Sequence, residues 1–197
     1  MKVLAFSDLH CDLRGAARLA EMSRDADVVV AAGDLASVHS GLEETVDALS
    51  AIETPTVLVP GNNETEDALR AACGGWDAAT VLHGNGAEAG GIEFFGLGAG
   101  IPVTPWDWSF DMDEDAAGEA LTRCPEGVFL VLHSPPHGHC DASRDRHLGS
   151  HAIAKAIAER RPRIAVCGHI HESWGERSEI EGVPVANLGP DGVVLEF

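Results

Sequence analysis

Short apolar runs alternate with stretches of helical periodicity along most of this chain, and that order constrains the fold more than any other feature. Buried strands are predicted for five apolar runs, namely residues 3–6, 28–32, 56–59, 128–132 and 164–167. Helices are predicted for five further segments, namely 14–24, 41–52, 64–73, 113–123 and 150–161. Such alternation is typical of βαβ units, in which helices cover a sheet of parallel strands.

Shorter segments indicate that the sheets are mixed. Residues 79–83 and 92–97 are predicted strands with Gly and Asn between them, and 183–186 and 193–197 are predicted to form an antiparallel finish. With 197 residues, 45% of them hydrophobic, the chain is long enough for a substantial core and too apolar for disorder. We therefore expect an α/β fold of mixed sheets in a single domain spanning residues 1–197.

The net charge of −19 limits the partners that the chain can bind. Its 32 acidic residues against 13 basic ones repel nucleic acid backbones and anionic lipids. Long nucleic acid and membranes are therefore excluded as expected partners. Two explanations for the acidity stay open, namely the surface chemistry of a salt-adapted organism and partial neutralisation by bound cations.

Cysteine usage and the start of the chain bear on location. The five cysteines are odd in number and show no Cys-x-x-Cys spacing, which argues against a disulfide framework or a structural zinc site. No apolar run approaches the length of a membrane span, and MKVLAFSD enters a strand-like pattern without the features of a signal peptide. We expect a cytoplasmic protein with reduced thiols.

The strongest functional signal is a set of polar side chains at the carboxyl ends of five predicted strands: Asp8, His10, Asp34, Asn62, His133, His169 and His171. Residues two apart in an extended segment point to the same side, so Asp8 and His10 are expected to face one point. The carboxyl ends of parallel strands form the edge where binding crevices lie. Seven such groups are harder to explain as separate helix caps or buried polar residues than as one site.

These side chains predict two metal ions. Imidazole nitrogens with carboxylate and amide oxygens suit Mn, Fe, Zn and similar divalent ions. Seven ligands exceed the needs of one tetrahedral ion but suit two ions that share one bridging ligand, which must be a carboxylate. Two metals about 3.5–4 Å apart polarise phosphoryl oxygens and hold a nucleophile for in-line attack.

In their order along the chain, these motifs resemble the calcineurin-like metallophosphoesterase superfamily. The stretches His133-Ser134-Pro135-Pro136 and Gly168-His169-Ile170-His171-Glu172-Ser173 resemble its small prokaryotic phosphodiesterase-like branch. The matching blocks are Asp8-Leu9-His10, Gly33-Asp34, Gly61-Asn62, His133 and Gly168-His169-Ile170-His171. The resemblance implies a four-layer αββα sandwich of two mixed sheets, metallo-dependent phosphatase-like, with the site at one edge.

The resemblance also implies a ligand assignment. Asp8, His10 and His171 would hold the first metal, Asn62, His133 and His169 would hold the second, and Asp34 would bridge the two. The two divalent ions would be Mn or Fe, with Zn, Ni and Mg as alternatives. A hydroxide that bridges the metals would then attack phosphorus.

The sequence departs from the family pattern at Asn63, which stands where the pattern has a histidine after Gly-Asn. That histidine resembles a general acid or a transition-state stabiliser near the leaving oxygen. Asparagine donates a hydrogen bond but gives up no proton at useful pH. Three consequences stay open: leaving groups that need little protonation, replacement of the acid by His137 or His139, or a feeble enzyme. Against the second, a solvated loop explains His137 and His139 equally well.

The expected function is hydrolysis of a small phosphoester, with a nucleotide-like substrate as one option and diesters favoured over monoesters. The alternative is a scaffold of the same fold that binds metal with little or no turnover. Two tryptophans, Trp106 and Trp108, lie in a Pro-rich loop at 101–108. They either stack on an aromatic substrate group or pack the loop down as a plug.

Overall fold

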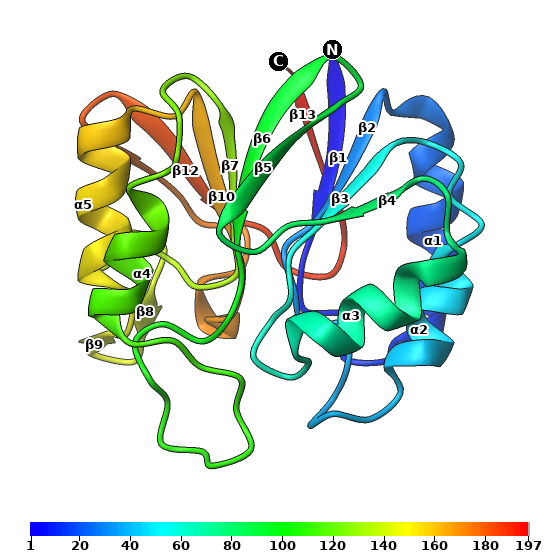
Figure 1. Ribbon diagram of the computed structural model, residues 1–197, viewed down its shortest axis with the longest axis horizontal. Coiled ribbons are helices and arrows are strands. Elements are labelled where there is room, and N and C mark those ends of the chain that lie inside the picture. The colour runs from blue at the N-terminus through cyan, green and yellow to red at the C-terminus, as the bar shows by residue number, and fades with distance from the viewer. Residues whose placement is uncertain (197) are drawn as a thin grey trace.

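Two β-sheets packed face to face, each covered on its outer side by helices, form the fold (Figure 1). The structure is a computed structural model that describes residues 1–196. The predicted four-layer arrangement of two mixed sheets is therefore confirmed. No helix in this described part of the chain has the length and apolar character needed to cross a membrane. The cytoplasmic location and the single-domain boundaries stay predictions.

The first sheet has the strand order β13-β1-β2-β3-β4. Its strands are β1 (Lys2–Phe6), β2 (Val28–Ala31), β3 (Thr56–Leu58), β4 (Ala79–Val81) and β13 (Val193–Glu196). All neighbours are parallel except β13, which runs antiparallel to β1. The helices on its outer side are α1 (Leu13–Met22), α2 (Leu42–Leu49) and α3 (Glu66–Ala72) (Figure 1).

The second sheet has the order β11-β12-β10-β7-β6-β5. Its strands are β5 (Asn85–Ala89), β6 (Ile92–Leu97), β7 (Phe129–Leu132), β10 (Ile164–Cys167), β11 (Arg177–Ile180) and β12 (Val183–Asn187). The helices α4 (Glu114–Leu121) and α5 (His151–Arg160) cover it, and β8 (Ala142–Ser143) and β9 (Arg146–His147) form a separate small ribbon (Figure 1).

Strand β1 shows why the apolar runs are continuous. Leu4 and Phe6 belong to the core under the helices, whereas Val3 and Ala5 belong to the core between the two sheets. Both faces of the strand are therefore buried, and each large side chain removed from water contributes about 1.5–3 kcal/mol. Side-chain caps start the helices: Asp12, for example, accepts a hydrogen bond from the Arg14 N–H at the start of α1.

The predicted helices and central strands are confirmed to within a few residues, and the structure adds two features that the sequence analysis did not give. The segment before 92–97 is a strand, β5, which pairs antiparallel with β6. The antiparallel finish is confirmed, since β12 pairs antiparallel with β11 and β13 pairs antiparallel with β1, but the two strands lie in different sheets. Phe197, which was included in the last predicted strand, lies outside the described residues.

Candidate metal centre

Two clusters of potential metal ligands lie side by side at the carboxyl ends of the strands. In each cluster, one ligand atom per residue lies within 4.8 Å of the others. The first cluster consists of Asp8, His10 and His171. The second consists of Asp34, His133 and His169. These six residues follow the strands β1, β2, β7 and β10, which belong to two different sheets, so their convergence is a property of the fold.

Asp34 lies between the two clusters. Its Oδ2 atom is 3.7 Å from His10 Nε2, and its Oδ1 atom is 3.5 Å from His133 Nε2. Asn62 Oδ1 lies 3.2 Å from the same His133 nitrogen. The structure thus brings all seven sequence-predicted residues together, with one carboxylate in position to reach both clusters.

The backbone at these loops is not extended, so the alternation argument for Asp8 and His10 is wrong although the two side chains do converge. Strand β1 ends at Phe6. Asp8, His10, Asp34 and His169 all have positive φ, with values of 57°, 44°, 57° and 68°. Non-glycine residues rarely adopt this conformation, and it is typical of functional sites where surrounding contacts hold the backbone.

The glycines of the Gly-Asp and Gly-Asn motifs allow the loops to touch. A Cβ atom at Gly61 would overlap the carboxylate of Asp34. At Gly33, where φ is +89°, a Cβ atom would come within 2.6 Å of His133 Nδ1. Any side chain at either position would therefore displace a cluster residue, and glycine is required by close approach.

Glu64 fixes the two loops that carry Asp34 and Asn62, a role that the sequence analysis did not predict. This carboxylate is 1% exposed. It accepts hydrogen bonds from the backbone N–H groups of Asp34 and Gly61, each at 2.8 Å, and of Ala36 at 3.0 Å. The one indication of this role in the sequence is that an acid ends the stretch Gly61–Glu64. An acid there is equally expected at the start of the helix predicted for 64–73.

Asn63 contacts Asp34 directly. Its Nδ2 group donates to Asp34 Oδ2 at 2.7 Å, and its Oδ1 accepts from the Val38 N–H at 2.8 Å. The amide is therefore oriented, since the Val38 bond fixes which end faces the carboxylate. In this arrangement Asn63 positions the central carboxylate, and one of its two amide N–H donors is engaged.

Two side-chain donors hold the carboxylate of Asp8. The Ser7 hydroxyl donates to Asp8 Oδ2 at 2.5 Å, and the indole N–H of Trp174 donates to the same atom at 3.1 Å. The Trp174 ring also lies against His171, with centroids 4.3 Å apart. Neither partner was predicted, because Trp174 follows the last motif and carries no metal-ligand chemistry of its own.

The electrostatics of the site favour the binding of cations. Burial lowers the pKa of His169 to about 3, so this imidazole keeps a lone pair for a metal. Burial also disfavours charge on His133, but the carboxylates of Asp34 and Asp8 outweigh that effect and raise its pKa. The same two carboxylates would attract divalent cations, whose charge offsets the burial of negative groups.

A cavity of about 410 Å³ opens above the clusters. Asp34, Asn62 and Asn63 form part of its floor, and Trp106 and Trp108 line it from the loop between β6 and α4. This loop projects below the sheets, in green, at the bottom of Figure 1. The site therefore combines metal-ligand chemistry with an aromatic wall.

His137 and His139 lie in the loop after β7, and neither is among the residues that line this cavity. The His137 ring packs on His151, with centroids 3.8 Å apart. His139 Nδ1 is 2.7 Å from the hydroxyl of Ser178. Their role as a replacement acid stays a prediction.

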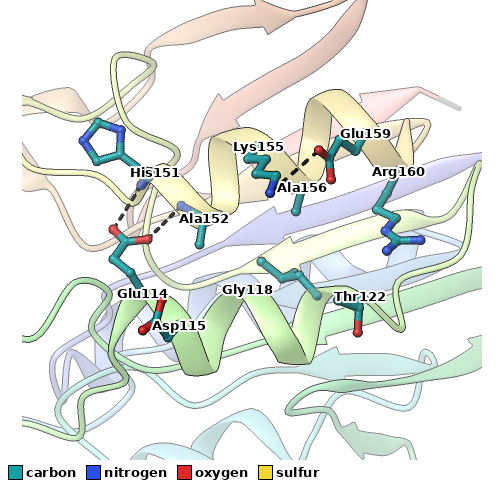
Figure 2. A pocket seen from close by; sticks show the side chains of 11 residues that line it. Glu114, Asp115, Gly118, Thr122, His151, Ala152, Lys155, Ala156, Glu159 and Arg160 are labelled. Carbon is teal, nitrogen blue, oxygen red and sulfur yellow. Dashed lines mark hydrogen bonds and ion pairs between the residues drawn. The ribbon is translucent and has the colours of Figure 1, made fainter.

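A second hollow, of about 430 Å³, runs between α4 and α5 (Figure 2). Some of its polar groups bond within the protein: Glu114 accepts hydrogen bonds from the N–H groups of His151 and Ala152 at 3.0 and 2.7 Å. Lys155 pairs with Glu159 at 3.9 Å. Within residues 1–196, neither metal-ligand cluster includes a residue of this groove. The groove is lined by residues of the two packed helices α4 and α5.

Comparisons with known proteins agree with this geometry. The profile of the calcineurin-like phosphoesterase superfamily domain matches residues 1–194. An uncharacterized protein of Methanocaldococcus jannaschii, MJ1162, is 30% identical over 188 residues, which cover 88% of this chain and 81% of that protein. The chain therefore belongs to the calcineurin-like phosphoesterase superfamily.

Solved structures show the same fold at low sequence identity. The protein TT1561 of Thermus thermophilus superposes with a TM-score of 0.76 at 18% identity, covering 96% of this chain and 90% of that chain. A dimetal phosphatase from Danio rerio superposes with a TM-score of 0.61 at 14% identity, covering 96% and 88%. The chain thus has a metallophosphoesterase fold with two His/Asp clusters that can hold metal ions.

Proposed function

We propose that this protein is a phosphoesterase that depends on two divalent metal ions. Asp8, His10 and His171 hold the first ion, and Asn62, His133 and His169 hold the second. The observation that carries the proposal is the position of Asp34, whose two oxygens lie 3.7 and 3.5 Å from histidines of opposite clusters. That position suits a bridging ligand.

The donor set suits Mn or Fe, because it combines imidazole nitrogens with hard oxygen ligands and has no thiolate. When bound, the ions supply polarisation of the phosphoryl oxygens and a water of lowered pKa. The chain supplies the position: Asn63 holds the Asp34 carboxylate, and Glu64 holds the backbone on both sides of the site. Zn, Ni and Mg are the alternatives to be compared.

The substrate is a small phosphoester, nucleotide-like in our proposal, with diesters favoured over monoesters. The net charge of −19 supports small substrates, since it repels long polyanions. The preference for diesters is supported by the resemblance to the phosphodiesterase-like branch, and direct comparison of mono- and diesters tests it.

Protonation of the leaving group is the weak step in this site, because the amide of Asn63 has no proton to give. We expect rates that fall steeply as the leaving-group pKa rises. Asn63→His should accelerate esters with poor leaving groups more than esters with good ones, since general acid catalysis is worth about 10²–10⁴-fold. Equal acceleration of both classes would contradict this. If His137→Gln or His139→Gln is slower than wild-type protein, and only on esters with poor leaving groups, that histidine is the replacement acid.

Hydrolysis of p-nitrophenyl phosphate and bis-p-nitrophenyl phosphate, with Mn, Mg, Ni and Zn in turn, tests the activity. Asp34→Ala should abolish turnover and the binding of a metal pair together. Asp47→Ala removes an exposed carboxylate of α2 and is the matched control, which should change neither. Absence of turnover in wild-type protein with metal verified as bound would support the alternative, a metal-binding scaffold of the same fold.

A further inference from the structure

The cavity above the metal clusters has an aromatic wall that metal chemistry does not require. The rings of Trp106 and Trp108 are nearly parallel, with centroids 5.6 Å apart and an interplanar angle of 14°. Both residues line the same cavity as Asp34 and His171. Trp106 is 50% exposed, so the loop does not bury this ring as a plug.

Hydrogen bonds fix the loop that carries these indoles to the metal site. Asn62 Nδ2 donates to the Ser109 hydroxyl at 2.9 Å, which in turn donates to Asp111 Oδ1 at 2.6 Å. The other oxygen of Asp111 accepts from the N–H and the hydroxyl of Thr104 at 2.7 and 2.8 Å. Because the loop is already ordered, a ligand that contacts the indoles loses little free energy in ordering it.

The tryptophans outside this loop differ from Trp106 in what their indoles contact. Trp76 is 5% exposed, and its indole N–H donates to the Ile52 carbonyl. Trp174 is engaged with Asp8. Trp174 is 37% exposed but packs on the ligand set, whereas Trp106 is 50% exposed and stacks on Trp108 in the wall of the cavity that would receive the phosphoester in the proposed function.

We propose that the substrate carries a planar aromatic group, a nucleobase or an aryl ring, which stacks on Trp106 while its phosphate lies at the metal clusters. Planar rings pack on indole in offset-stacked geometry, and such contacts tolerate different rings because each has a π face. This inference rests on the proposed phosphoesterase function for the position of the phosphate, but its test does not depend on turnover.

The test compares matched ligands that differ only in the ring. The pairs are AMP with ribose 5-phosphate, and phenyl phosphate with cyclohexyl phosphate, each with Mn-loaded protein. The preference within a pair is measured as a ratio of Kd values by calorimetry, or, where an ester is turned over, as a ratio of its inhibition constants against a p-nitrophenyl ester that the protein hydrolyses. A ratio of kcat/KM is not used, because phenyl and cyclohexyl phosphate also differ in their leaving groups. The variants are Trp106→Ala and Trp106→Phe. Val103→Ala is the control, since Val103 is 61% exposed in the same loop but does not line the cavity.

We expect wild-type protein to prefer the aromatic member of at least one pair by about fivefold or more. Trp106→Ala should reduce that ratio toward one, whereas Trp106→Phe and Val103→Ala should retain most of it. A preference for AMP would identify the stacked group as a nucleobase. A preference confined to phenyl phosphate would identify it as an aryl group. No preference in either pair, or a ratio unchanged in Trp106→Ala, would overturn the inference. Failure of the metal-loaded protein to hydrolyse any ester would instead refute the proposed function. The ratios of Kd values would still decide whether an aromatic group stacks on Trp106.

Discussion

Replacing Trp174 by phenylalanine removes a single hydrogen bond from the proposed metal centre and leaves most of the packing. The indole N–H donates to Asp8 Oδ2 at 3.1 Å, and the ring lies 4.3 Å from the ring of His171. Phenylalanine keeps an aromatic ring beside His171 but has no donor. The change therefore tests whether Trp174 orients a metal ligand or only covers it.

The magnitude follows from the surroundings of Asp8. Its carboxylate is 2% exposed and has other donors, the Ser7 hydroxyl at 2.5 Å and the His169 N–H at 3.0 Å. It is therefore not stripped of partners when the indole N–H is removed. A hydrogen bond to a charged group contributes about 1.5–3 kcal/mol, and outer partners of metal ligands typically change affinity by about 10- to 100-fold. We expect Trp174→Phe to weaken binding of the first metal by that factor.

Competition for Mn against a chelator of known affinity measures this effect, and Trp76→Phe is the control. Trp76 also donates its indole N–H, to the Ile52 carbonyl at 2.8 Å, but in the core away from the clusters. Trp76→Phe should lower the free energy of unfolding by about 1 kcal/mol and leave Mn affinity within about twofold. Equal Mn affinities for wild-type protein and Trp174→Phe, or equal losses in both variants, would refute the reasoning.

Three other perturbations have defined outcomes. Glu64→Ala should lower the free energy of unfolding by at least about 3 kcal/mol in a urea titration, because several buried N–H groups lose their acceptor at about 1–3 kcal/mol each. The control Glu44→Ala, on the exposed face of α2, should lower it by less than about 0.5 kcal/mol. Mn at about 100 times its Kd should stabilise the protein by about 2.7 kcal/mol, and EDTA should reverse the shift in Tm; a Tm insensitive to Mn would contradict the metal centre. A thiol reagent at pH 8 should modify one cysteine quickly, namely Cys11, because its side chain is only half-buried. Burial raises the pKa of Cys73, Cys124 and Cys140 to about 11, so these thiols should react slowly. Several fast-reacting thiols in the native protein would contradict that prediction.

Much of the site could be predicted because its residues are attached to strongly patterned elements. The apolar runs of β1, β2, β3, β7 and β10 are buried on both faces, so their carboxyl ends could be placed at one edge. Ligand-type side chains at those ends then had to converge. The reason given for the Asp8 and His10 pair was nevertheless wrong, since positive φ angles turn both side chains inward after the strand has ended.

The supporting contacts could not be predicted, because they join residues far apart in the chain. Trp174 reaches Asp8 across 166 positions, and Asn63 reaches Asp34 across 29. Strand β5, with the sequence Asn-Gly-Ala-Glu-Ala, has a composition that disfavours strands. It forms because β6 offers an open edge for pairing, which is a tertiary effect that overrides local preference.

Crystals of the protein soaked in Mn offer the most direct test of the two-metal site. An anomalous difference map should show two peaks per chain about 3.5–4 Å apart, with the carboxylate of Asp34 between them. Asn62 and His133 should lie at one peak, and Asp8 and His171 at the other. A single peak, or two peaks of which neither contacts Asp34, would contradict the account.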